Sequence, residues 1–504
     1  MELVREKIEA VLKLAPAENA VEFERSWFSW AQIAAVKAAL ERHMEALGPA
    51  GRVAVLMRNR PEIISAALAC VGQRQCIVTI NPIYPEDRVA DDFREADAPI
   101  VIATTTDWNR PQVSAALLAS GALCLEVTMD AENPVTVRQA PTAPLKDHAR
   151  AFAPGVAVEM LTSGTTGKPK RIPLRSADYE KSLLGAAAFE RGRSEVDAPK
   201  LRSGVSLLTN SFAHTSGLSG VIGVVLSGRK SCLLDKFRVE DFADAVRRHR
   251  PKVAGAPPAA LRMLMDANLP ADTFSSLVAL RTGTAPLDPA LADAFYDTYG
   301  IPVLQNYGAT EFGGVAGWTL DDFKAYRTTK RGAVGRLNAD IEGRAADLET
   351  GEPVAPGEKG VLQLKGQRIG NGKDWLTTTD LAIVDADGFV FILGRADSAI
   401  IRGGFKVHPD DVRKGLEAHP DVVEAGVTGI PDRRLGQVPV AACVLKSGSS
   451  VSVDDLLVFA RSQMAPYQVP VQIRIVDELP RTALLKVSLP ELAALFGNNA
   501  EGEK

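Results

Sequence analysis

The chain has 504 residues, of which 46% are hydrophobic and 24% are charged, and its formal net charge at pH 7 is −4. This composition is typical of a soluble globular protein with two or more domains, and the slightly acidic balance disfavours nucleic acid as a partner. The five cysteines are scattered through apolar stretches without a Cys-x-x-Cys pair, which favours buried thiols over disulfides or a metal site. A cytoplasmic location is therefore expected.

The first fifteen residues predict an amphipathic helix rather than a signal peptide, because charged residues separate its apolar residues into short groups. One face of this helix would carry Leu3, Val4, Ile8, Val11 and Leu12. The longest apolar runs, near 63–72 and 220–227, reach about half of a bilayer span. No membrane-spanning segment is expected.

The next part of the chain alternates between two patterns. RVAVLMRN (52–59) and QCIVTI (75–80) are apolar runs rich in β-branched residues, and PEIISAALACVG (61–72) between them has helical character. Alternation of this kind favours parallel sheets covered by helices. The predicted fold class is α/β, with a large N-terminal domain of parallel or mixed sheets.

A segment rich in small and hydroxyl residues, MLTSGTTGKPKRIPL at 160–174, lies between two apolar stretches. Glycines let backbone N–H groups approach an anion, and Lys168 and Lys170 supply positive charge, so a phosphate suits this loop. The glycine spacing is not that of a P-loop, and the flanking residues 156–161 and 171–174 predict strands rather than a helix. A surface turn without a ligand is the alternative on composition alone.

Two further segments suit a nucleotide. VLQNYGATEFGG, at 303–314, offers the aromatic face of Tyr307, the hydroxyl of Thr310 and the carboxylate of Glu311. These groups suit a base, a phosphate and a divalent metal ion.

In the later segment, Asp380 can accept hydrogen bonds from a ribose diol, and Arg395 can donate to it. Gly403 and Gly404 permit close backbone approach, and DELPRTALLKV places Lys486 near the end of the chain. Each feature alone is ordinary, and their combination is the informative signal.

The composition also changes along the chain. From about residue 331 short apolar segments are separated by glycine and proline, which predicts a β-rich subdomain over 331–394. Amphipathic helical and strand patterns resume after it. The simplest division is an N-terminal domain of residues 1–394, which includes that subdomain, and a small α+β domain of residues 395–504.

In this order and at these separations, the segments resemble those of the adenylate-forming superfamily of acyl-CoA synthetases, luciferases and peptide-synthetase adenylation domains. The loop is similar to the signature Thr-Ser-Gly-Thr-Thr-Gly-x-Pro-Lys, and YGATE is similar to Tyr-Gly-x-Thr-Glu. GRADSAIIRGGFKV is similar to Gly-Arg-x-Asp and the following Gly-Gly-x-Lys-Val. The resemblance covers residues 27–492 and implies a mobile C-terminal domain with a hinge near Asp397.

The resemblance also implies a set of nucleotide contacts. The residues expected to contact the β- and γ-phosphates are Thr162, Ser163, Gly164, Thr165, Thr166, Gly167 and Lys168. Tyr307 would stack on adenine, and the residues expected along the edge of the base are Gly283, Thr284, Ala285, Pro286 and Asn306. The remaining cofactor-binding residues expected are Gly308, Thr310, Asp380, Arg395, Gly403, Gly404 and Lys406. Glu311 would ligate Mg²⁺.

The activity that the resemblance implies is ATP-dependent ligation of a carboxylic acid to CoA. The acid attacks the α-phosphate with release of pyrophosphate, and CoA then takes the acyl group with release of AMP. The first step brings two anions together, so Mg²⁺ and an ammonium group are expected to neutralise charge. The expected catalytic residues are Lys486, His214, Thr165 and Glu311. The cofactors and partners are ATP, Mg²⁺, CoA and a small carboxylic acid.

Some positions leave alternatives open. His214 is expected beside the acyl group, although a core histidine is the alternative, and the glycine pair at 403–404 is also compatible with a β-turn. Thr379, Leu485 and Leu489 depart from the family pattern, which has glycine, glycine and arginine there. Small residues near the expected acyl site favour an aromatic or medium-length acid, and helix packing is the alternative role for Gly217, Gly220, Ala309, Gly313 and Gly314.

Two other functions are compatible with the sequence. In one, the acyl group passes to an amine or to a carrier-protein thiol. In the other, suggested by Leu485 and Leu489, the protein is a nucleotide-binding regulator whose catalytic loop has decayed. A homo-oligomer is among the possible assemblies, and no pattern selects an oligomeric state.

Overall fold

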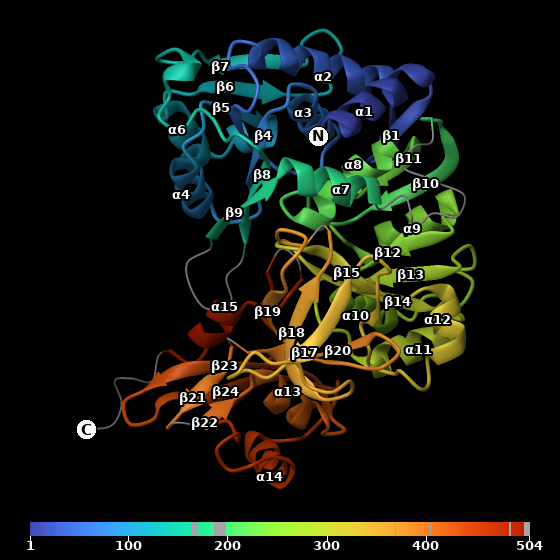
Figure 1. Cartoon of the computed structure of the whole chain (residues 1–504), viewed down its shortest axis with the longest axis vertical. Coiled ribbons are helices and arrows are strands. Elements are labelled where there is room, and N and C mark those ends of the chain that lie inside the picture. The colour runs from blue at the N-terminus through green and yellow to red at the C-terminus, as the bar shows by residue number, and fades with distance from the viewer. Residues whose placement is uncertain are drawn as a thin grey trace. The chain divides into compact units, whose positions relative to one another are not determined.

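The computed structural model describes residues 1–162, 170–185, 198–367, 369–396, 398–403, 405–482 and 485–497 (Figure 1). These residues form two compact units. The first contains the described residues up to Leu304 together with Gly308–Gly313. The second contains Gln305–Tyr307 and the described residues from Gly314 onward. The predicted division at 394/395 stays a prediction.

The first unit is built around a mixed sheet with the strand order β7-β6-β5-β3-β4-β8-β9. Strands β6, β5, β3, β4 and β8 run parallel, and β7 and β9 are antiparallel edge strands. The bounds are β3 Arg52–Leu56, β4 Cys76–Ile80, β5 Ile100–Thr104, β6 Leu123–Val127, β7 Val135–Gln139, β8 Val156–Thr162 and β9 Lys170–Arg175.

Helices cover both faces of this sheet, as the alternation in the sequence predicts. Val53 and Val55 of β3 join a buried cluster with residues of α3, and Ala54 and Leu56 join a cluster with residues of α4 and α6. Successive side chains of a strand point to opposite faces, so each face has its own apolar core. These helices span Pro61–Gly72 (α3), Glu86–Ala96 (α4) and Pro111–Ala119 (α6) (Figure 1).

The N-terminal helix forms as predicted, over Glu2–Leu14 (α1). Its buried side chains are Val4, Ile8, Val11 and Leu12. The prediction that Leu3 shares this face is wrong, because Leu3 is 41% exposed. At about 100° per residue, Leu3 lies on the side of Val4 that faces away from Ile8 and Leu12, and therefore outside the buried stripe.

A second sheet of the first unit has the order β10-β11-β1-β2. Its strands are β1 Asn19–Phe23, β2 Ser26–Ser29, β10 Arg202–Leu208 and β11 Arg229–Leu233. The helices of this region include α2 Trp30–Met44, α8 Thr215–Leu226, α9 Val239–His249, α10 Pro258–Asp266 and α11 Pro289–Tyr299. Strands β12 Val253–Gly255 and β13 Ala279–Thr282 are parallel neighbours, and β14 Val303–Ala309 follows them in the strand order.

The second unit contains the strands of the predicted β-rich segment and the C-terminal sheet. The former follow the order β15-β16-β20-β19-β18-β17, and the latter has the order β22-β21-β24-β23, with β25 paired to β24. The first set comprises β15 Gly313–Gly317, β16 Gly335–Leu337, β17 Glu342–Ala346, β18 Lys359–Lys365, β19 Leu376–Val384 and β20 Phe389–Arg395. The second set comprises β21 Ile400–Arg402, β22 Phe405–Val407, β23 Val422–Asp432, β24 Gly436–Leu445 and β25 Gln472–Ile475.

The C-terminal sheet is accompanied by helices α13 Pro409–Glu417, α14 Val453–Gln463 and α15 Leu489–Ala494. The predicted α/β class with mixed sheets is confirmed. Among the helices that the structure describes, none is both long and apolar enough to cross a bilayer.

Candidate nucleotide site

The segment predicted to bind phosphate is bounded by two paired strands. β8 and β9 are antiparallel, and their last pair is Thr162 opposite Lys170. The prediction of a strand on each side is therefore confirmed. Residues outside the described part of the chain are Ser163, Gly164, Thr165, Thr166, Gly167 and Lys168, and of Thr162 only the place in β8 is described. Their phosphate contacts stay predictions.

The structure brings together three of the predicted adenosine-binding residues in the second unit. The hydroxyl of Tyr307 donates a hydrogen bond to Oδ2 of Asp380. Asp380 in β19 is paired directly with Arg395 in β20. The backbone N–H of Asp380 also donates to Oγ1 of Thr378, at 3.1 Å. The carboxylate and the guanidinium thus lie on the neighbouring strands β19 and β20, and the Tyr307 hydroxyl reaches the carboxylate from β14, an arrangement that suits a ribose beside a base.

A second group of predicted residues meets in the first unit. His214 precedes the first residue of α8, and the next hydroxyl, that of Thr215, donates to Oγ1 of Thr310 at 3.3 Å. Thr215 also lies 3.1 Å from the sulfur of Met160 in β8. Glu311 follows Thr310 in the turn before β15, and its side chain is exposed. An exposed carboxylate next to a hydroxyl suits Mg²⁺, which is usually held by one or two carboxylates and by substrate phosphates.

Two residues that position this group were missed by the sequence analysis. Thr215 lies directly after His214 in the motif TNSFAHTSG, and a hydroxyl at that place was a usable signal. Asn59 was a harder case, because its partners are far away in the chain. Its Nδ2 donates to the carbonyls of Asn210 and Leu234, both at 3.1 Å, and its Oδ1 accepts from the N–H of Phe212 at 3.0 Å.

The turn expected along the edge of adenine follows β13. Gly283 is buried, Ala285 is half-buried and Pro286 is exposed. Thr284 has a φ of +70°, a left-handed conformation that is rare for a β-branched residue. Such conformations cost about 1–3 kcal/mol and cluster at ligand sites. Asn306 and Gly308, on either side of Tyr307, are exposed.

The C-terminal motifs lie in turns of the second unit. Gly403 has a φ of +56° between the paired residues Arg402 and Phe405, which is the geometry of a tight hairpin. The β-turn alternative for this segment is therefore supported. Gly404 and the predicted hinge residue Asp397 lie outside the described residues, and of Lys406 only the place in β22 is described.

Lys486 lies in a short turn whose backbone is closed by hydrogen bonds. Its carbonyl accepts from the N–H of Thr482 at 2.7 Å, and Arg481 Nη1 donates to the carbonyl of Leu485 at 3.0 Å. Leu485 has a φ of +59°. This conformation favours glycine, so the structure gives a physical reason why leucine is an unusual choice there.

The glycines near the expected acyl site do not have one role. A Cβ on Gly217 would lie 2.0 Å from the carbonyl oxygen of Ser211, so this glycine is needed for packing of α8. At Gly220 and Gly314 a Cβ would meet nothing within 4 Å. Gly313 has a φ of +69° at the start of β15. The packing alternative therefore holds for Gly217.

Within the described residues, one cluster has the side chains of a metal site, namely Glu22, Cys232 and His249. Their potential ligand atoms all lie within 4.8 Å of one another. However, Arg248 Nη1 lies 2.6 Å from Glu22 Oε1, and His249 Nε2 lies 2.8 Å from Glu22 Oε2. Burial raises the pKa of the Cys232 thiol to about 11, which disfavours the thiolate that a metal requires. The cluster is an ion network that joins β1 to α9.

The chain is similar to known proteins over most of its length. Residues 8–372 match the family described as AMP-binding enzyme, and residues 414–486 match the AMP-binding enzyme C-terminal domain. The chain is 30% identical over 463 residues to a 2-succinylbenzoate–CoA ligase of Geobacillus kaustophilus, with 88% of each protein covered.

Solved structures show the same fold. ATP-bound MatB from Rhodopseudomonas palustris has a TM-score of 0.80 at 23% identity, and covers 98% of this chain and 99% of its own. The amide bond synthetase McbA from Marinactinospora thermotolerans has a TM-score of 0.77 at 23% identity, with 98% and 100% covered. With a family match over residues 8–372 of 504, the chain belongs to the AMP-binding enzymes of the adenylate-forming superfamily, as its motifs predict.

Proposed function

We propose that this protein is an ATP-dependent acid:CoA ligase that forms an acyl-adenylate, releases pyrophosphate and then transfers the acyl group to CoA. The observation that carries this proposal is the contact between Tyr307 and Asp380, with Asp380 opposite Arg395. These are the residues expected to hold adenosine. The relative from Geobacillus kaustophilus, which is named a CoA ligase, supports the same reaction class.

Different side chains have different roles in the adenylation step. Asp380 accepts hydrogen bonds from the ribose hydroxyls, and Arg395 donates to the same sugar. Thr310 donates to the α-phosphate, and the ammonium of Lys486 stabilises the charge that develops as the carboxylate attacks. Bound Mg²⁺ would neutralise phosphate oxygens, and Glu311 is the residue suited to hold it.

The two half-reactions are proposed to use different parts of the C-terminal region. Residues 395–504 form the mobile domain in this proposal, with its hinge at Asp397. Lys486 serves adenylation, and the turn at Gly403 serves thioester formation, because a thiol approaching the acyl-adenylate needs backbone without side chains.

A pyrophosphate-release assay tests the proposal. Purified protein is given ATP, Mg²⁺, CoA and a panel of aromatic and aliphatic acids. Release of pyrophosphate and AMP should depend on a suitable acid, and an acyl-CoA should accumulate. Cleavage of ATP to ADP, or pyrophosphate release that is independent of the acid, would refute it.

The second candidate is an adenylating enzyme that passes the acyl group to an amine. The fold shared with the amide bond synthetase McbA favours this acceptor over a carrier protein. The two candidates are separated by replacing CoA with a panel of amines. Amide formation at a rate above that of the thioester would select the second candidate.

A further inference from the structure

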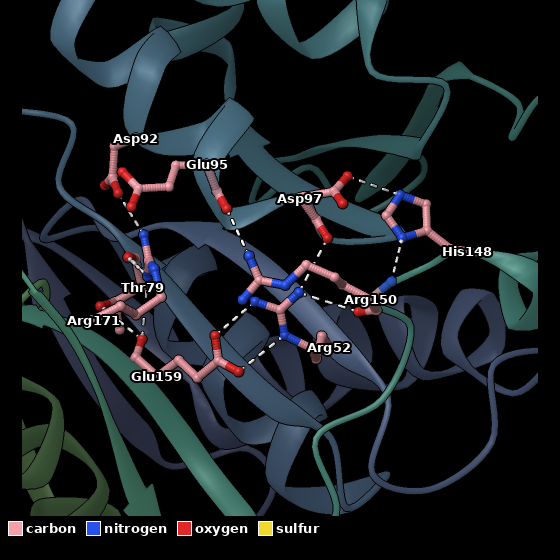
Figure 2. A network of polar contacts seen from close by, with 9 residues as sticks. All are labelled: Arg52, Thr79, Asp92, Glu95, Asp97, His148, Arg150, Glu159 and Arg171. Carbon is pink, nitrogen blue, oxygen red and sulfur yellow. Dashed lines mark hydrogen bonds and ion pairs between the residues drawn. The ribbon is translucent and has the colours of Figure 1, made fainter.

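The strands on both sides of residues 163–169 are tied to the rest of the first unit by two arginines. β8 carries Glu159, three residues before its end, and β9 carries Arg171 as its second residue. Figure 2 shows Glu159 between the guanidinium groups of Arg52 and Arg171. The two arginines are far apart in the chain. Neither of them is among the predicted nucleotide contacts.

Arg52 holds β8 from the beginning of β3, although β4 lies between these two strands. Its Nε and Nη2 donate to the two carboxylate oxygens of Glu159, at 3.0 and 2.6 Å. Its Nη1 donates to the carbonyls of Asp97 and Arg150, at 3.0 and 3.1 Å. The Arg52 side chain is only 2% exposed, so this two-pronged contact is shielded from water.

Arg171 holds β9, which is the last strand of this sheet and, among the described residues, pairs with β8 alone. Its Nη1 donates to the carbonyl of Thr79 in β4 at 3.0 Å, and Nη2 donates to the carboxylate of Asp92 in α4. The guanidinium therefore reaches across β8 to the next strand and to a helix. No lysine could make these divergent contacts at once, because its donors lie on a single nitrogen.

The ion pair between Arg171 and Asp92 is expected to add little to the free energy of folding. Burial raises the pKa of the Asp92 carboxyl in spite of the opposing effect of Arg171, so the ionised form is disfavoured by the fold. Buried ion pairs commonly return no more free energy than their desolvation costs. The pair does, however, fix the position of β9 relative to α4.

We propose that Arg171, held by Asp92, is a positioning residue for ATP binding: it fixes β9, the strand that follows the predicted phosphate-binding residues, relative to β4 and α4. Arg52 and Glu159 do the same for β8. This inference rests on the proposed function, in which the segment between β8 and β9 binds the β- and γ-phosphates of ATP. Small displacements of binding groups can have large effects on binding and rate.

The test compares two ligands that differ in the phosphates the segment would hold. The dissociation constants of Mg²⁺–β,γ-methylene-ATP and of AMP are measured by calorimetry for the full chain. Arg171→Met should weaken binding of the triphosphate by about tenfold or more, and binding of AMP by no more than about twofold. The dissociation constant of the triphosphate for Arg171→Lys should lie between those of wild type and Arg171→Met, because lysine keeps the positive charge but lacks the two separate donor nitrogens of the guanidinium group. Asp92→Asn keeps the shape of the partner and should give a smaller effect of the same kind.

Arg138 offers a matched control at the other edge of the same sheet. It lies in β7 and donates to the buried Glu126 in β6 through Nε, at 2.5 Å. Arg138→Met removes the same kind of side chain from an edge strand and should leave both dissociation constants within about twofold of wild type. Thermal unfolding of each variant reports any general loss of stability.

The outcomes are distinguishable. If wild type binds no β,γ-methylene-ATP, the proposed function fails and this inference fails with it. If wild type binds the analogue, and Arg171→Met, Arg171→Lys and Asp92→Asn bind it with unchanged affinity, the inference alone is refuted. Equal weakening of the triphosphate and AMP, or the same loss in Arg138→Met, assigns a purely structural role and also refutes it. If Arg171→Met does not fold, Arg171→Lys and Asp92→Asn decide the question.

Discussion

Removing one hydroxyl group should reveal how the adenosine-binding residues act together. In Tyr307→Phe the ring that would stack on adenine remains, and the hydrogen bond to Asp380 is lost. A hydrogen bond to a charged group contributes about 1.5–3 kcal/mol, and both side chains here are half-buried, so the lower half of that range applies. At 1.4 kcal/mol per tenfold change, about 1.5–2.2 kcal/mol corresponds to a rise of about 12–40-fold in KM for ATP.

The assay is ATP–pyrophosphate exchange at saturating acid, and a double-mutant cycle isolates the contact. Asp380→Ala should raise KM for ATP more than Tyr307→Phe, because it also removes the acceptor for ribose. In the Asp380→Ala background the Tyr307 hydroxyl has already lost its acceptor, so removing it as well should change KM little, and the two effects should not add. Tyr326→Phe is the control, since Tyr326 packs on Phe389 in the same unit. A change of less than about twofold in Tyr307→Phe, or strict additivity in the cycle, would contradict this reasoning.

Three further outcomes are expected. Lys486→Ala should lower kcat of adenylation by about 100-fold or more with little change in KM for ATP, because the ammonium acts on charge that develops during reaction. Arg52→Met leaves the largely buried carboxylate of Glu159 without its guanidinium partner, which should cost about 3–5 kcal/mol and lower the unfolding midpoint of this 504-residue chain by about 3–5 °C, and adding Glu159→Gln should restore much of this loss. The five cysteines should react slowly with a thiol reagent at pH 8 and rapidly in denaturant, because burial keeps them protonated, raising the pKa of Cys76 and Cys443 to about 12.

Each of these expectations has a result that contradicts it. Unchanged kcat of adenylation in Lys486→Ala would contradict the proposed role of this ammonium, and no change in any measured activity would support the decayed regulatory protein. An Arg52→Met variant as stable as wild type would mean that water or a neighbouring group compensates Glu159, and Arg138→Met again serves as the control. Rapid modification of native thiols at pH 8, measured by release of the coloured leaving group, would show that the buried thiols become accessible through opening of the fold.

Local patterns were enough to predict the strands β8 and β9 on either side of residues 163–169. Strand β8 was predictable from the valines and other apolar residues on both sides of Glu159, and the pairing of Asp380 with Arg395 agrees with the predicted ribose contacts, which stay predictions. Leu3 was misassigned because five apolar residues in the first turns compete for a stripe that accommodates four. The periodicity alone does not say which one is excluded.

The contacts of Arg171 could not have been predicted in this way. Its partners Thr79 and Asp92 lie 92 and 79 residues earlier in the chain, in a different strand and in a helix. A charged residue in an edge strand is most often a solvated one, and only the folded arrangement of β4, β8 and α4 turns it inward. The contact between Thr215 and Thr310 is a similar case, with a separation of 95 residues.

The edge strand β9 also bears on how the protein behaves at high concentration. Exposed strand edges can recruit strands from other molecules and start β-aggregation. Pro173, which is opposite Glu159 in the ladder, cannot donate a backbone hydrogen bond, and Arg175 adds an exposed positive charge. Because Arg171 is drawn inward and Pro173 has no backbone N–H to donate, β9 is a poor template for a foreign strand.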